Sequence, residues 1–95
     1  MVRTTKDYET EFIEIPTGPG KHGEPIIKGK GPKVCLFASD ARYRGLTPEE
    51  ILNNGWKGYL TLEEINAALD FAEKYPWLID WDRYKPEPEE VWHRD

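Results

Sequence analysis

The chain repeats one helix-start motif, Leu-Thr-x-Glu-Glu-Ile, at residues 46–51 and again fourteen residues later at 60–65. In each copy a threonine, Thr47 or Thr61, is followed three residues later by a glutamate, Glu50 or Glu64. This spacing predicts a capping box, because the threonine hydroxyl can accept the third helical amide while the glutamate accepts the threonine amide. We therefore expect two helices to begin at these positions, with the other elements packed around them.

Apolar spacing and chain breakers set the expected extent of the helices. The strongest pattern follows the second motif, where apolar residues recur at 62, 65, 69 and 72 until Pro76 ends the run. A helix ahead of the first motif has Gly45 in the place of a left-handed C-terminal cap, but no side-chain cap at its start. The predicted helices cover about residues 33–44, 48–54 and 62–75.

Upstream of the helices, β-branched and aromatic residues between Gly and Pro breakers predict short strands at 8–15 and 24–28. A chain of 95 residues has room for one modest core. We expect a single mostly α domain over residues 1–76, with short N-terminal β strands and a three-helix, helix-turn-helix-like core. Residues 77–95 are expected to form an extended aromatic C-terminal arm.

Charge and cysteine content narrow the class of protein. The net charge is −5, yet residues 1–46 hold eight Lys/Arg against six Asp/Glu, net +2, while residues 47–95 hold five against twelve, net −7. A polyanionic partner should therefore approach the first half. Cys35 is the only cysteine, which excludes an intramolecular disulfide. With no apolar run long enough for a signal or a membrane span, we expect a cytoplasmic protein that contacts no membrane.

No pattern in the chain specifies a reaction. Residues 18–23 match the letters of a dinucleotide-binding glycine loop, but Pro25 and two β-branched residues follow where a helix should begin. Cys35 lies between apolar neighbours, and His22 and His93 are too far apart in sequence to show ligand or catalytic spacing. We therefore predict a protein that is not an enzyme and that needs no metal or cofactor.

Basic residues in the first half are the candidates for nucleic-acid contact, with a merely solvated surface as the alternative. They are Lys28, Lys30, Lys33, Arg42 and Arg44. The third helix is a poor reader of the major groove, because its polar stripe carries carboxylates that repel phosphate.

The C-terminal arm carries the candidates for contact with a protein partner, because Trp, Tyr and Arg dominate binding hot spots. These are Trp77, Trp81, Arg83, Tyr84 and Trp92. Three tryptophans in so polar a segment need a surface to cover them. The sequence leaves open whether that surface is the chain's own core, a second copy or another protein.

Two blocks of the chain resemble the domain of unknown function 433 family. Residues 45–52, Gly-Leu-Thr-Pro-Glu-Glu-Ile-Leu, are similar to the family's Gly-Met-Ser-Pro-Glu-Glu-Ile-Leu, and residues 60–72 to its Leu-Thr-Leu-Glu-Asp-Ile-Arg-Ala-Ala-Leu-Ala-Tyr-Ala. A third block, residues 23–29, resembles its Gly-Lys-Pro-Val-Ile-Arg-Gly. The chain departs from the family at Lys30, where Thr-Arg would follow, and at Asn66, which replaces a usual Arg.

The resemblance implies a homeodomain-like helical core and an antitoxin-like role, with a DNA-binding domain and an extension that binds a ribonuclease toxin. We accordingly expect a small non-enzymatic antitoxin-like or regulatory interaction protein. Its basic first half would contact DNA, and its aromatic acidic tail would contact a toxin-like protein. We also expect a homodimer, because exposed strand edges invite pairing. The alternative is a protein-binding adaptor or structural homo-oligomer that does not bind nucleic acid.

Overall fold

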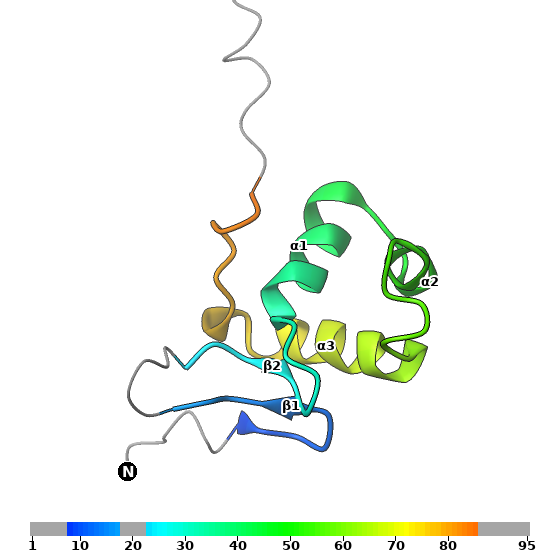
Figure 1. The fold of residues 1–95 in the computed structure, drawn as a ribbon. Coiled ribbons are helices and arrows are strands. Elements are labelled where there is room, and N and C mark those ends of the chain that lie inside the picture. The colour runs from blue at the N-terminus through cyan, green and yellow to red at the C-terminus, as the bar shows by residue number, and fades with distance from the viewer. Residues whose placement is uncertain (1–7, 18–22, 86–95) are drawn as a thin grey trace, which may run out of the picture.

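The computed structural model describes residues 8–17 and 23–85 (Figure 1). In these residues a two-stranded antiparallel sheet precedes three α-helices and a 3-10 helix. The elements are β1 (Ile13–Glu14), β2 (Ile26–Ile27), α1 (Val34–Arg44), α2 (Pro48–Asn53), α3 (Leu62–Lys74) and η2 (Pro76–Leu78). The expected mostly helical fold with short N-terminal strands is therefore confirmed.

Both predicted capping boxes are formed. At α2 the Thr47 hydroxyl accepts the Glu50 amide at 3.2 Å, and the Glu50 carboxylate accepts the Thr47 amide at 2.8 Å. At α3 the corresponding bonds between Thr61 and Glu64 measure 3.1 and 2.9 Å. Gly45 ends α1 with a φ of 70°, a left-handed conformation that glycine adopts without a steric penalty.

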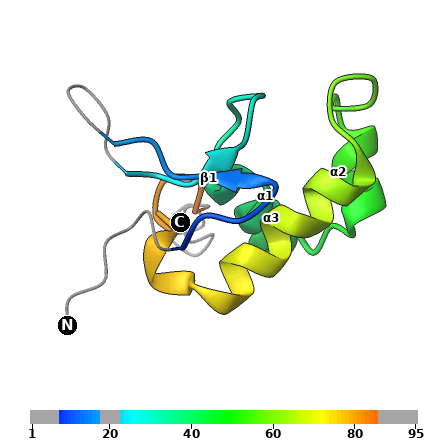
Figure 2. The ribbon, with the colours of Figure 1, turned by 90° about the horizontal axis from the view of Figure 1, so that it is seen from below.

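The core lies where α3 packs against α1, α2, η2 and β1. In Figure 1, α1 and α2 lie above α3 and the strands lie below it; Figure 2 shows the strands from beneath. Every element except η2 contributes fully buried side chains, including Ile13 and Ile27 from the strands, Val34 and Phe37 from α1, Ile51 from α2, and Ile65 and Ala68 from α3. Within the described residues, no helix is long and apolar enough to cross a bilayer.

The strands are shorter than predicted because the flanking chain turns back and takes the edge hydrogen bonds. Outside β1, the Thr10 amide donates to the Ile13 carbonyl at 3.0 Å, and the Glu9 carboxylate accepts the Ile15 amide at 2.8 Å. Outside β2, the Ile27 amide donates to the Pro32 carbonyl at 2.9 Å. The backbone groups expected to pair with a second copy are thus satisfied within the chain at these positions, so the dimer prediction needs another contact surface.

Residues 54–61 connect α2 to α3 through two turns, and Gly55 and Gly58 take positive φ values of 101° and 91° there. Trp56 from this connection packs edge-on against Phe37 of α1, with ring centroids 5.2 Å apart. The helix-turn-helix resemblance of α2 and α3 stays a prediction.

Beyond η2, Ile79 is buried in the same core and Trp81 packs against it. In Figure 1 the segment after η2 runs upward beside α1. The part of the predicted arm that the structure describes therefore begins on the domain's own surface.

Candidate functional site

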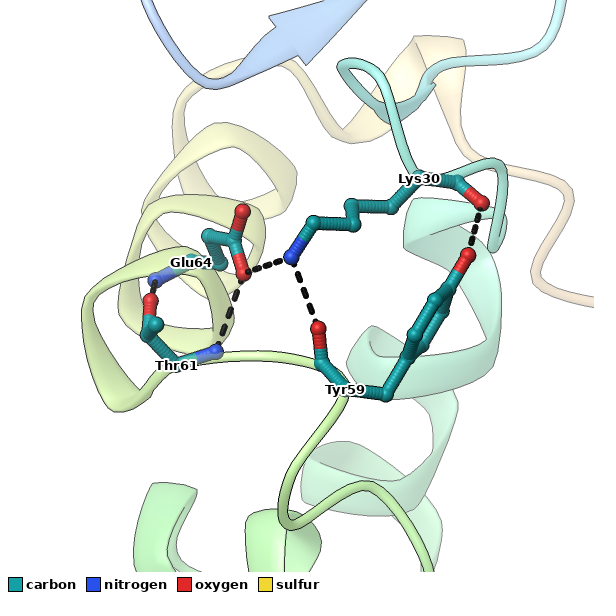
Figure 3. Close-up of polar contacts among 4 residues, drawn as sticks. All are labelled: Lys30, Tyr59, Thr61 and Glu64. Atoms are coloured by element: carbon teal, nitrogen blue, oxygen red, sulfur yellow. Dashed lines mark hydrogen bonds and ion pairs between the residues drawn. The ribbon is translucent and has the colours of Figure 1, made fainter.

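Lys30 connects two loops that lie far apart in sequence (Figure 3). Its ammonium donates to the Tyr59 carbonyl at 2.7 Å and to the Glu64 carboxylate at 3.3 Å, and it lies 5.3 Å from the centroid of the Tyr59 ring. The Tyr59 hydroxyl in turn donates to the Lys30 carbonyl. Glu64 is also the capping glutamate of α3, so Lys30 fixes the turn after β2 to the start of that helix.

The other predicted nucleic-acid residues are distributed over separate contacts. Lys33 pairs with Glu24 at 3.0 Å, Arg44 pairs with Asp40 at 3.3 Å, and the Arg42 guanidinium lies 4.0 Å from the centroid of the Trp81 ring. The Lys28 side chain is exposed and makes no hydrogen bond or ion pair with the described residues. Four of the five cations therefore have internal partners, and they do not form one uncompensated basic patch.

Glu24 joins the start of α1 to the C-terminal segment, because its two carboxylate oxygens accept Lys33 at 3.0 Å and Arg83 at 2.7 Å. Burial acts to raise the pKa of Glu24, but the hydrogen bonds and charges of Lys33 and Arg83 outweigh it and hold that pKa below its usual value. Arg83 is also 3.5 Å from Asp80. Arg83, predicted to contact a partner, is therefore occupied by two carboxylates of its own chain.

The thiol of Cys35 is buried in the core. Burial, followed by the charge of Glu24, raises the pKa of this thiol, which disfavours the nucleophilic thiolate. Among the described residues, no group of three or more His, Cys, Asp or Glu could hold a metal ion.

The predicted aromatic anchors have different environments. Trp81 is half-buried, and its indole N–H donates to the Pro76 carbonyl at 2.9 Å. Trp77 is 65% exposed and Tyr84 45% exposed. Trp92 lies outside the described residues, so its environment stays a prediction.

Trp77 belongs to an aromatic surface, which we define as Tyr8, Tyr75 and Trp77. The three rings contact one another edge-on, with centroids 4.8 Å apart for Tyr8 and Tyr75, 5.7 Å for Tyr75 and Trp77, and 6.2 Å for Tyr8 and Trp77. Phe71 supports Tyr75 from α3 at 5.1 Å. The exposed indole is thereby held in place by its neighbours.

A groove of about 200 Å³ runs from this aromatic surface along α3. Its lining residues are Thr10, Ala67, Asp70, Phe71, Lys74 and Tyr75. The surface thus combines a rigid aromatic anchor, a neighbouring depression and charges of both signs. An isolated sequence could not reveal it, because Tyr8 and Tyr75 are 67 positions apart and meet only in the folded chain.

No protein-family model, curated protein or solved structure matches this chain.

Proposed function

We propose that this chain is a small non-enzymatic interaction protein that binds a protein partner through the aromatic surface. The observation that carries the proposal is Trp77, which is 65% exposed although two aromatic rings hold it. An ordered, exposed Trp loses little conformational freedom on binding and removes a large apolar area from water. Such residues supply most of the binding energy in protein interfaces.

The experiment compares wild-type protein with Trp77→Ala, using Tyr84→Ala as a matched loss of an exposed aromatic outside the surface. Each full chain is immobilised, and the proteins that it retains from a lysate of the source cells are identified by mass spectrometry. The retained protein is then purified, and its Kd for each full chain is measured by titration. Trp77→Ala should weaken its binding by about 30-fold, which corresponds to about 2 kcal/mol, whereas Tyr84→Ala should change it by less than about fivefold. Equal Kd values for wild type and a correctly folded Trp77→Ala protein would refute the proposal.

The antitoxin-like or regulatory role rests on the family resemblance, with a toxin-like protein as the partner it implies. Contact with DNA is a second proposal, supported by the net positive first half and by the exposed Lys28, whose side chain pairs with none of the described residues. It has less support than protein binding, because the other candidate cations have partners in the chain. Its test is the affinity for the gene's own upstream DNA against random DNA across a salt series, where specific binding should weaken steeply with salt.

A further inference from the structure

A second, larger depression of about 380 Å³ lies between α1 and α3 and is walled by Trp81; we call it the interhelical groove. Apart from two charged residues, its lining is apolar: Ala38, Ala41, Leu69, Ala72, Pro76 and Trp81. Ala38 and Ala72 are almost fully buried, with 3% and 4% exposure, whereas Ala41, Leu69 and Trp81 are partly exposed. A surface that packs there would remove apolar atoms from water.

The two charged lining residues have opposite signs and come from different helices. Arg42 belongs to α1 and Glu73 to α3, and both are exposed. Neither makes an ion pair with any described residue, whereas Lys30, Lys33, Arg44 and Arg83 all do. Arg42 is nevertheless positioned, because its guanidinium lies over the Trp81 ring.

Opposite charges on the two walls of one groove suit a twofold contact between identical chains. A partner surface of one charge sign would attract one of the two charged residues and repel the other. A second copy of the chain, turned by 180°, presents Glu73 where Arg42 needs a carboxylate and Arg42 where Glu73 needs a cation. The apolar stem of Arg42 can at the same time cover Ala41 and Leu69 of the facing groove, which are partly exposed.

We infer that the interhelical groove is the contact surface of a homodimer, held by two reciprocal pairs between Arg42 of one copy and Glu73 of the other. The outer strand edges are already hydrogen-bonded within the chain, so this surface replaces the edge pairing expected from the sequence. No lining residue belongs to the aromatic surface, although Pro76 lies between Tyr75 and Trp77 in the sequence. The inference is independent of the proposed partner binding.

Sedimentation equilibrium and native mass spectrometry of the full chain test the inference through charge reversal. Arg42→Glu and Glu73→Lys should each weaken self-association by about tenfold or more, because each places two like-charge contacts in the dimer. An equimolar mixture of the two variants should associate with an affinity within about threefold of wild type, since both pairs in the mixed dimer again join opposite charges. Lys28→Glu and Glu11→Lys make the same charge changes away from the groove and should leave the dimer unaffected.

The mixture separates an interface from a folding defect, because a damaged fold cannot be repaired by a second damaged chain. The inference is overturned if wild-type protein stays monomeric up to about 100 µM, a concentration at which a dimer of micromolar Kd would dominate. It is also overturned if either variant dimerises like wild type, or if the mixed dimer does not form. None of these results affects the Trp77 test, which measures affinity for a different protein.

Discussion

Replacing Lys30 by methionine should destabilise the domain, although this residue reads as a surface cation in the sequence. Methionine keeps a long apolar side chain but cannot donate to the Tyr59 carbonyl or to Glu64, the contacts measured at 2.7 and 3.3 Å. It also removes the cation over the Tyr59 ring. The turn after β2 would lose its polar attachment to the start of α3.

The expected loss in the free energy of unfolding is about 1–2 kcal/mol. A partly exposed ion pair contributes about 0.2–1 kcal/mol, and an exposed cation–π contact about 0.5–1 kcal/mol. The hydrogen bond to the carbonyl adds about 1 kcal/mol, although the three terms share one ammonium and do not add fully. In a domain of this size, the loss should lower Tm by roughly 4–15 °C.

Urea unfolding followed by tryptophan fluorescence measures this loss, with Lys28→Met as the matched control. Lys28 lies in the same turn, and its side chain has no ion pair or hydrogen bond to the described residues. Its replacement should change stability by less than about 0.5 kcal/mol. If both variants unfold at the same urea concentration, the contacts of Lys30 do not stabilise the fold and the reasoning fails.

Two further predictions concern the caps and Glu24. Thr47→Ala and Thr61→Ala should each lower the free energy of unfolding in urea by about 1 kcal/mol. Serine at either position keeps the hydroxyl and should lower it by only a few tenths of a kcal/mol. Equal stabilities for the Ala and Ser variants would contradict this. The pKa of Glu24 is lowered in the folded state, so its ionised carboxylate stabilises the fold. This stabilisation is complete at pH values above the ordinary pKa of 4.5 and is lost as pH falls through the lower folded pKa. Glu24→Gln should therefore lower the free energy of unfolding by about 1–2 kcal/mol at pH 7 and by much less at low pH. Glu11→Gln is the control. If it shows the same pH dependence, the ion pairs of Glu24 are not the cause.

The helix starts could be predicted because their signals are local. A capping box needs only two side chains three positions apart, so Thr47 and Thr61 could be assigned from the sequence and their bonds are present in the structure. Gly45 likewise ends α1 because no neighbour from elsewhere in the chain is needed to favour its left-handed conformation. Most of the helical fold follows from such signals, which span only a few consecutive residues.

The candidate site could not be predicted in the same way, because its determinants are distant in sequence. Lys30 meets Glu64 34 positions later, and Glu24 meets Arg83 59 positions later. Nothing near Lys30 in the sequence distinguishes a cation that stabilises the fold from one that is available to bind phosphate. Nor does the local sequence show that the Trp81 indole is hydrogen-bonded to the Pro76 carbonyl while Trp77 is exposed.

These internal contacts affect the two candidate interactions in opposite directions. A phosphate that binds Lys30 must replace the hydrogen bonds of its ammonium to Tyr59 and Glu64. Losing these contacts costs about 1–2 kcal/mol, which offsets part of the attraction between the phosphate and Lys30. Trp77 makes no hydrogen bond to the described residues that a partner would have to replace, and covering this 65% exposed residue removes on the order of 130 Å² from water, which is about 3 kcal/mol. The residues of this chain therefore favour a protein partner at the aromatic surface over a nucleic acid at the basic residues. A polyanion that binds tightly would have to rely on Lys28 and on cations whose present contacts it can keep intact.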